Sequence, residues 1–428
     1  MTFTIHTLGC KVNQYESSAI SAVFIENGAV LVDENSACDV YCVNTCAVTE
    51  ESVRKSKPMI RRARRKNPGA VIVVCGCAGH ADTGFADSVP EADIIIGNRG
   101  KARVFDYVMR FLETRERIVD IADISKENVF EKMKSERIGT TRATLKIQDG
   151  CNNFCSYCII PYARGRIRSK DIEEAVCEAE ALAKGGCREI VLSGIHLDNY
   201  GKETGKFGLT DLLLRLDGIE GLERVRVGSL EPVFITEETV AKMSAVRNLC
   251  HHFHLSLQSG CGKTLRAMNR HYTPGEFAAA VGLLRKTFPD CSVTTDIIVG
   301  FPGETEEDFA ESLRFAEKMR FARVHVFPFS ERKGTRAAEM DGKLSKEVKD
   351  ERCRRMIAAC SVNEEKIREE LVGKIKKVLF ETEKDGIYTG YTPEYAEVCV
   401  RSDRDITNMI LPVLITGVSR GHAEGRLA

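Results

Sequence analysis

The sequence has no surplus of charge of either sign. Among its 428 residues, Lys and Arg together number 62 and Asp and Glu together also number 62, so the formal net charge is zero. A neutral chain has no long-range field that would attract nucleic acid. Any binding to nucleic acid would therefore have to depend on local basic patches.

Long apolar runs are also missing. No stretch approaches the roughly 18 apolar residues that a membrane-spanning helix needs. The first residues, Met1 to His6, alternate like a strand and do not form a basic stretch followed by an apolar core and a cleavage site. We therefore expect a soluble cytoplasmic protein without a membrane partner.

Cysteine, in contrast, is abundant. The chain has 17 cysteines, which is a high and odd number for a reducing compartment, where structural disulfides rarely persist. Metal ligation or thiol chemistry is thus the leading explanation for some of them.

The chain length and the pattern of apolar runs predict an α/β protein with three domains. Residues 1–114 are expected to form a small parallel, Rossmann-like α/β domain, because short β-branched runs alternate there with helix-compatible segments. Its predicted strands are Thr4–Leu8, Val40–Val43, Val71–Val74 and Ile94–Ile96. In such sheets the functional loops lie at the carboxyl ends of the strands.

After a charged linker at about 115–140, residues 137–367 contain six strand-like runs separated by segments that suit helices, which predicts a partial (β/α)6 barrel. The expected strands are Ala143–Gln148, Glu189–Leu192, Val225–Gly228, Phe253–Leu257, Ser292–Val299 and Val324–Phe327, and the clearest helices are Ile172–Lys184, Pro274–Thr287 and Glu306–Met319. A charged helix at Lys346–Glu370 follows.

Residues 370–428 have short alternating strands with turns between them and no helical period, which predicts a small OB-like β-barrel. The strands are expected at Ile375–Phe380, Ile387–Tyr391, Ala396–Val400 and Leu411–Ile415.

The sharpest motif is the C-x3-C-x2-C run formed by Cys151, Cys155 and Cys158, directly after the first strand of the central domain. Three thiolates this close together can hold three irons of one [4Fe-4S] cluster and leave the fourth iron open. A structural zinc site is the alternative, but zinc prefers two pairs of ligands, and no fourth Cys or His follows at a suitable spacing.

This motif, with Tyr157 as the aromatic residue before the last cysteine, resembles the signature of radical S-adenosylmethionine (SAM) enzymes. The resemblance implies that the open iron binds SAM and that reductive cleavage gives a 5′-deoxyadenosyl radical. Family members bind SAM with residues at the carboxyl ends of the barrel strands. Besides Tyr157, the candidates at such places are Gly194, Ser229, Glu231, Gln258 and Arg270, each of which could instead be an ordinary residue of the barrel rim.

A second set of cysteines, Cys10, Cys46 and Cys77, follows three predicted strands of the N-terminal sheet. Loops from neighbouring parallel strands converge at one edge, so these thiolates could ligate a second cluster. Spacing alone leaves open that they are three separate buried cysteines that pack as small hydrophobic residues.

The strings L-G-C-K-V-N-Q-Y-E (Leu8–Glu16), N-T-C-A-V-T (Asn44–Thr49) and C-G-C-A (Cys75–Ala78), together with the radical SAM motif, resemble the methylthiotransferase family over nearly the whole chain. In that family Cys10, Cys46 and Cys77 correspond to the ligands of an auxiliary [4Fe-4S] cluster, whereas Cys75 does not match and is expected to pack. The first two strings resemble the MtaB-type branch, whose members add a methylthio group to carbon 2 of N6-threonylcarbamoyladenosine beside the anticodon of tRNA.

The resemblance implies three partners: the anticodon stem-loop of a tRNA, an electron donor and a sulfur source. Two regions could bind RNA, namely the basic segment Arg54–Lys66 and the C-terminal domain, which resembles a TRAM domain. The residues of that domain that could contact RNA are Lys374, Lys376, Lys377, Arg401, Arg404 and Arg420, with Tyr388, Tyr391 and Tyr395. We expect a monomer.

Other functions remain open at this point. Within the family the product could instead be methylthiolated N6-isopentenyladenosine or a methylthiolated aspartate of a ribosomal protein. A non-catalytic iron-sulfur protein that binds RNA is an alternative from another class. The intact C-x3-C-x2-C run counts against that alternative.

Overall fold

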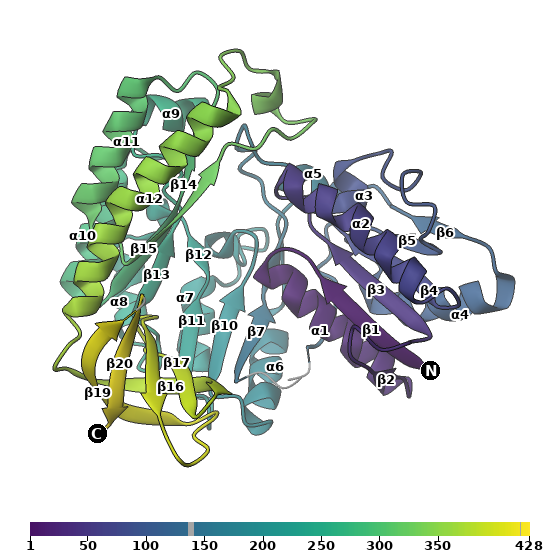
Figure 1. Cartoon of the computed structure of the whole chain (residues 1–428), viewed down its shortest axis with the longest axis horizontal. Coiled ribbons are helices and arrows are strands. Elements are labelled where there is room, and N and C mark those ends of the chain that lie inside the picture. Colours follow the sequence, from purple (N-terminus) through teal and green to yellow (C-terminus); the bar gives the residue numbers. More distant parts are fainter. Residues whose placement is uncertain (136–140, 420) are drawn as a thin grey trace.

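The computed structural model describes residues 1–135, 141–419 and 421–428. Figure 1 shows an N-terminal α/β unit on one side, a larger central unit of strands and helices beside it, and a small barrel at the C-terminus. This arrangement confirms the predicted α/β fold in three parts.

The N-terminal sheet has six strands, all parallel, in the order β2-β1-β3-β4-β5-β6. The strands are β1 (Thr2–Thr7), β2 (Val30–Leu31), β3 (Val40–Thr45), β4 (Val71–Gly76), β5 (Ile94–Ile96) and β6 (Ile118–Asp120). Strand β6 pairs with β5, so the sheet continues beyond residue 114 into the segment that was expected to be a linker. With two residues in β2 and three in β6, these edge strands are too short to give a periodic signal.

Helices cover both faces of this sheet, as a doubly wound fold requires. They are α1 (Lys11–Glu26), α2 (Glu50–Lys66), α3 (Ala78–Ala81), the 3-10 turn η1 (Lys101–Arg103), α4 (Val104–Thr114) and the 3-10 turn η2 (Ile124–Lys126). Phe24 of α1 and Val108 of α4 belong to one apolar core, and Ile60 of α2 belongs to the other. Because both faces of the sheet are covered, the strands β3 and β4 are buried along their whole length.

The central unit has two parallel sheets that follow one another, in the orders β11-β10-β7 and β12-β13-β14-β15. Their strands are β7 (Arg142–Lys146), β10 (Glu189–Ser193), β11 (Arg224–Val227), β12 (Ser229–Leu230), β13 (His252–Leu255), β14 (Ser292–Val299) and β15 (Arg323–Pro328). Only Gly228 separates β11 from β12, so these two short strands together occupy one strand position. The central unit therefore has six strand positions, as the predicted partial (β/α)6 barrel requires.

The outer helices of the central unit begin at strong capping residues. Asp171, Thr273 and Thr305 each accept a hydrogen bond from a backbone N–H of the first turn, which starts α6, α10 and α11 where the sequence predicts. The longer helices are α6 (Ile172–Lys184), α7 (Leu209–Leu216), α8 (Glu237–Ser244), α10 (Pro274–Thr287), α11 (Glu306–Met319) and α12 (Lys346–Glu369). The shorter elements are β8 (Gln148–Asp149), α5 (Ile160–Arg164), β9 (Arg168–Ser169), η3 (Leu197–Asn199), η4 (Pro232–Phe234), α9 (Gly262–Ala267) and η5 (Arg336–Glu339).

The C-terminal unit is a closed barrel in the order β16-β17-β18-β20-β19. Its strands are β16 (Ile375–Lys384), β17 (Ile387–Tyr391), β18 (Glu397–Arg401), β19 (Ile410–Ser419) and β20 (His422–Leu427). The fifth strand, β20, was not expected, because its sequence contains no β-branched or aromatic residue.

The barrel packs against the amino ends of the central strands. On β11, Arg224 donates to the carbonyl oxygens of Tyr391 (2.9 Å) and Lys377 (2.8 Å), and Arg226 donates to that of Pro393 (2.9 Å). Because guanidinium groups bind several carbonyls at once, these contacts close that end of the central unit. Within the described part of the chain, no helix combines the length and the apolar character needed to cross a membrane.

Candidate active site

The two predicted cysteine sets occupy loops that face one another. Cys10 and Cys77 are the residues directly before α1 and α3, and Cys46 directly follows β3. The helix α5 starts two residues after Cys158 and packs against α3. At this contact Cys77 lies among Ala47, Ile159 and Ala163.

The first set converges on Cys46, which is 3% exposed. Burial raises the pKa of its thiol to about 11, and the neighbouring thiols of Cys77 and Cys10 add to this effect. Gly9 allows the approach, because it has a φ of +106° and an added Cβ would lie 2.8 Å from the Cys46 Sγ. Three thiols that approach one another at one edge of a sheet are compatible with a shared cluster. Burial also raises the pKa of Cys42, which has Cys75 and Cys38 as neighbours, so the proximity of thiols does not by itself distinguish cluster ligands from packing residues.

The second set lies in a loop that is fixed by the segment after α9. Phe154 has a left-handed φ of +47°. Asn269 donates from its side chain to the Phe154 carbonyl (3.1 Å), and the Ser156 N–H donates to the Met268 carbonyl (3.0 Å). Burial raises the pKa of Cys158 to about 12, with Cys155 and Cys151 adding to it. Metal coordination would compensate this desolvation, because a coordinated thiol loses its proton.

Arg270 connects this loop with the end of β12. One of its terminal nitrogens lies 3.2 Å from the Cys155 Sγ, and the other pairs with the Glu231 carboxylate. Tyr157 packs against the apolar cluster that includes Phe301 and Phe329. Of the predicted SAM-binding residues, Tyr157 therefore belongs to the cysteine loop itself, and Arg270 and Glu231 lie beside it.

The other three candidates lie at the carboxyl ends of neighbouring strands. Gly194 follows β10, and an added Cβ there would come within 2.9 Å of the Gln148 Oε1. Gln258 follows β13 with a left-handed φ of +64°, and its N–H donates to the Asp296 carbonyl (2.9 Å). Ser229 begins β12 and is exposed.

Sequence reasoning missed His196. Its Nδ1 lies 3.7 Å from the Cys151 Sγ, and its Nε2 lies 3.1 Å from the Asp198 Oδ2. The only signal in the sequence was its position two residues after Gly194. A polar residue of that kind is common in loops, so position alone did not distinguish it.

A buried charge network that sequence reasoning also missed joins the two cysteine loops. Glu16, six residues after Cys10, accepts hydrogen bonds from Arg164 of α5 (2.9 Å) and from Lys146 (2.7 Å), and it pairs with Lys101. Burial favours the neutral form of Glu16, but Arg164, Lys101 and Lys146 outweigh that effect, so the pKa of this carboxyl lies well below its usual range. Since these side chains are fully or almost fully buried, the network fixes α1 against α5.

Asn98 makes a second bridge between the cysteine loops. Its side-chain amide lies 3.3 Å from the Cys77 Sγ and donates to the Ala163 carbonyl at 2.7 Å. One residue of the N-terminal unit thus contacts both a predicted cluster ligand and the helix that follows the other cysteine set.

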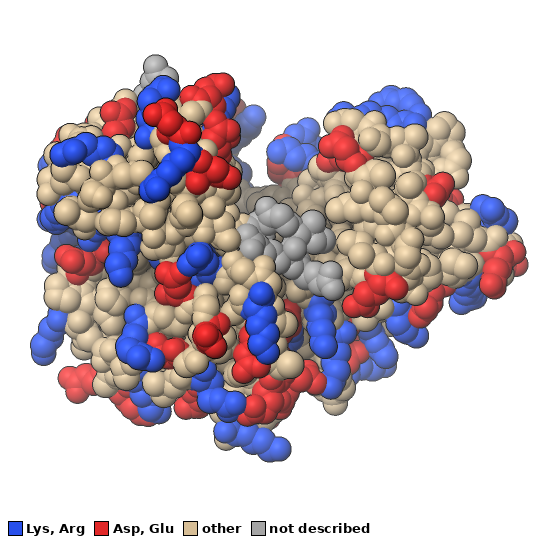
Figure 2. Space-filling model, turned by 90° about the horizontal axis from the view of Figure 1, so that it is seen from below, with Lys and Arg blue, Asp and Glu red and all other residues tan. Residues whose placement is uncertain are grey.

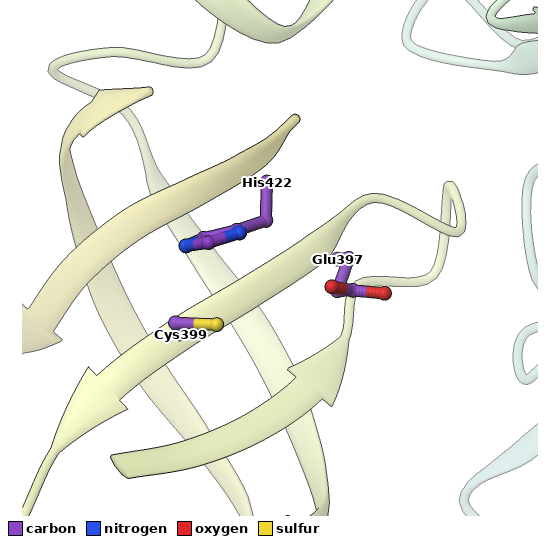
Figure 3. Close-up of side chains that lie close together, drawn as sticks. All are labelled: Glu397, Cys399 and His422. Atoms are coloured by element: carbon purple, nitrogen blue, oxygen red, sulfur yellow. The ribbon is translucent and has the colours of Figure 1, made fainter. Parts of the chain in front are cut away.

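Single-ion geometry occurs elsewhere. A single metal ion needs at least three His, Cys, Asp or Glu ligand atoms close together. Among the described residues, three such atoms lie within 4.8 Å of one another only at Glu397, Cys399 and His422. Figure 3 shows that these side chains come from neighbouring strands of the C-terminal barrel. They belong to a different domain from all six predicted cluster ligands. A [4Fe-4S] cluster spreads its thiolates over separate irons, so a single-ion geometry is not expected at those cysteines.

The predicted RNA-binding residues differ in their accessibility. In α2, Arg62 and Arg65 are exposed, whereas Arg64 pairs with Asp93 (2.5 Å). In the barrel, Tyr388 is a core residue at 7% exposure, and Tyr395 contacts Arg226 (4.7 Å from the ring centre).

The barrel tyrosines therefore stabilise the barrel and its interface with the central unit. Of the predicted barrel cations, Lys374, Lys377, Arg401 and Arg404 are exposed, and Arg420 lies outside the described residues. Figure 2 shows Lys and Arg interspersed with Asp and Glu over the face seen from below, as a neutral chain would suggest.

Comparisons with known proteins identify the families that this chain resembles. Residues 145–316 match the radical SAM superfamily, and residues 2–97 match the uncharacterized protein family UPF0004. The chain is 38% identical to the threonylcarbamoyladenosine tRNA methylthiotransferase MtaB of Bacillus subtilis, over 99% of this chain and 96% of that protein. It is 34% identical to the tRNA-2-methylthio-N(6)-dimethylallyladenosine synthase of Caldicellulosiruptor saccharolyticus, over 100% and 92%.

Among solved structures, the fold is similar to that of TsrM, a radical S-adenosylmethionine methyltransferase from Kitasatospora setae. The TM-score is 0.57 at 13% identity, over 91% of this chain and 80% of that chain. At this identity the similarity supports the fold alone.

Proposed function

The chain belongs to the tRNA methylthiotransferase family of radical SAM proteins, and from this premise we propose that it adds a methylthio group to carbon 2 of N6-threonylcarbamoyladenosine in tRNA. The observation that supports this most strongly is the contact between α3 and α5, which brings the two cysteine loops together. Transfer of a sulfur-containing group to an unactivated carbon requires the radical source and the sulfur carrier to be close to one another.

The cofactors are two [4Fe-4S] clusters and SAM. In this proposal Cys151, Cys155 and Cys158 ligate the cluster that binds SAM, and Cys10, Cys46 and Cys77 ligate the auxiliary cluster. The donor sets fit, because each offers three thiols, the former set within one loop and the latter at one edge of the N-terminal sheet. In addition, backbone N–H groups point at two of the sulfurs. The N–H of Asn153 lies 3.4 Å from the Cys151 Sγ, and that of Val48 lies 3.5 Å from the Cys46 Sγ.

The SAM site is proposed to consist of Tyr157, Gly194, Ser229, Glu231, Gln258 and Arg270, with His196 added from the structure. When bound, the clusters and SAM supply a carbon-centred radical. The aromatic C–H group at carbon 2 requires a radical because acid-base catalysis cannot activate it. Glu231 and Arg270 form an ion pair that holds a carboxylate and a guanidinium beside Cys155. These two groups can orient the amino and carboxylate groups of the methionine part of SAM.

The chain's own contribution is to hold this arrangement and to exclude water. Arg164, Glu16 and Lys146 are buried between the cysteine loops and fix their spacing. We propose that exposed cations of α2 and of the barrel bind phosphates of the tRNA anticodon stem-loop, since cations bind phosphates through counterion release. The reductant and the sulfur source are external partners, and we expect a cytoplasmic monomer.

Mass spectrometry of nucleosides tests the proposal. Undermodified tRNA would be incubated without oxygen with the reconstituted protein, SAM, sulfide and a strong reductant. A methylthio mass gain on threonylcarbamoyladenosine is the expected result. A gain only on isopentenyladenosine would contradict the proposed substrate and favour the second candidate, for which relatives of 34% identity carry the corresponding name.

Two further outcomes are informative. SAM cleavage with neither gain would point to a protein substrate such as a ribosomal aspartate. Absence of 5′-deoxyadenosine in the presence of both clusters would contradict an enzymatic role and favour an RNA-binding iron-sulfur protein.

A further inference from the structure

A cavity of about 280 Å³ lies where the three domains meet. Its walls include Lys11 and Gln14 of α1, Arg142 and Thr144 of β7, and Tyr395 from the C-terminal barrel. Ligand pockets usually measure roughly 300–1,000 Å³. This cavity is thus large enough for a substituent of a base and too small for a whole nucleotide.

Lys11 is the cation in this cavity that lacks a partner. Among the residues that the structure describes, it forms no ion pair, although Arg142 beside it is paired with Glu381 at 2.6 Å. Lys11 is exposed, and its ammonium group lies within electrostatic range of Tyr395 and Glu189 as well as of the guanidinium groups of Arg142 and Arg226. The nearby carboxylates of Glu381 and Glu189 are paired with Arg142 and Arg226, so they leave the ammonium group free to bind an anion in this partly enclosed space.

The position of Lys11 relates the cavity to the reaction centre. Lys11 directly follows Cys10, and consecutive Cα atoms are only about 3.8 Å apart. Thr144 alternates along β7 with Leu145, which faces the outer helices, so Thr144 faces the inner side of the central unit. A base held beside the auxiliary cluster could therefore extend a substituent into this cavity.

We propose that Lys11 binds the carboxylate of the threonylcarbamoyl group and thereby selects N6-threonylcarbamoyladenosine over adenosines with an uncharged N6 substituent. This inference rests on the proposed function and extends it to one specificity-determining residue. Gln14 is one helical turn from Lys11 and on the same face, so its amide can bond the carbamoyl or hydroxyl oxygen. An isopentenyl group offers no charge, so it would leave the ammonium group of Lys11 without an anionic partner.

Binding measurements test this inference without turnover. Fluorescence anisotropy would compare three labelled anticodon stem-loops, carrying threonylcarbamoyladenosine, its methyl ester or plain adenosine, with the cluster-containing protein in the absence of SAM. We expect the ester to bind roughly ten- to hundredfold more weakly than the acid, which corresponds to the loss of one charge-assisted hydrogen bond. Because this comparison leaves the protein unchanged, it cannot be affected by misfolding.

The matching variants are Lys11→Met and Lys11→Arg, with Lys184→Met, an exposed residue of the outer helix α6, as the control. Lys11→Met should lose the preference for the acid over the ester, Lys11→Arg should keep most of it, and Lys184→Met should keep all of it. In turnover, Lys11→Met should raise KM for the acid substrate while kcat changes little.

Two results would overturn the inference while the proposed function stands: equal binding of acid and ester by the wild-type protein, or equal weakening of all three stem-loops by Lys11→Met. The second would identify Lys11 as a phosphate contact. The proposed function itself fails separately, if the wild-type protein yields no methylthio product from threonylcarbamoyladenosine.

Discussion

The two cysteine sets achieve the same donor chemistry in different ways. Cys151, Cys155 and Cys158 lie within one eight-residue loop, and Asn269 and Met268 fix the shape of that loop. Cys10, Cys46 and Cys77 come from three segments, each directed to one edge of the N-terminal sheet by its own strand. The first set depends on local spacing and the second on strand pairing, so the second should be more sensitive to changes in packing.

The largest expected effect follows from removing a ligand of the local set. Cys155→Ala should abolish both SAM cleavage and methylthiolation, because without this cluster no radical forms. Measurement of 5′-deoxyadenosine and of the methylthio product tests this. Retention of SAM cleavage would contradict the assignment of the C-x3-C-x2-C loop.

Removing a ligand of the dispersed set should separate the two activities. Cys46→Ala should leave 5′-deoxyadenosine formation intact, abolish methylthiolation and reduce the iron content by about four atoms per chain. The matched control is Cys75→Ala, since Cys75 is buried in the apolar core of the same sheet. Equal iron loss in the two variants would mean that the effect reflects packing.

A glycine pair tests how strongly the dispersed set depends on packing. Gly9→Ala places a Cβ 2.7 Å from the Cys46 Cβ, whereas Gly28→Ala, at a φ of +78°, meets nothing within 4 Å. We expect Gly28→Ala to cost only the backbone strain of about 1–2 kcal/mol. Gly9→Ala should in addition lose the auxiliary cluster, which electron paramagnetic resonance can count. Full retention of both clusters would show that the loop around Gly9 can change its conformation without displacing Cys46.

The buried network between the two sets can be tested by its contribution to stability. Arg164→Leu leaves Glu16 without its main partner and should lower the free energy of unfolding by about 3–5 kcal/mol, as measured by urea denaturation. Arg215→Leu is the control, because its ion pair with Glu173 is exposed and should contribute nothing measurable. Similar midpoints for the two variants would show that the network adds no stability.

The smallest expected effect concerns pH. The pKa of Glu16 is held well below its usual value of 4.5, so its unfolded form binds a proton more readily than its folded form. Its contribution to stability is therefore present above about pH 4.5 and is lost as the pH falls through the lower, folded-state pKa. Glu16→Gln should flatten the acid side of the unfolding profile between these limits. An unchanged profile would exclude Glu16 as the titrating group.

Much of the fold was predictable from local patterns. The helices α6, α10 and α11 have the predicted bounds because their capping residues and their apolar periodicity agree. The strands β2, β6 and β20 were not predicted, since they are short or polar and exist only because a neighbouring strand offers hydrogen bonds. The tyrosines of the barrel illustrate the same limit, because only the structure shows that they pack in the barrel core or against the central unit.

By itself the sequence determined the local features: the C-x3-C-x2-C loop, the order of strands and helices, and the placement of Cys10, Cys46 and Cys77 after three strands. Only the tertiary structure decided that α3 meets α5, that Arg164 reaches Glu16 across 148 positions, and that Lys11 faces a cavity formed by three domains. The physical reason is the range of the forces involved. Backbone propensities and caps act over a few residues, whereas the pairing of buried charges depends on which surfaces folding brings together.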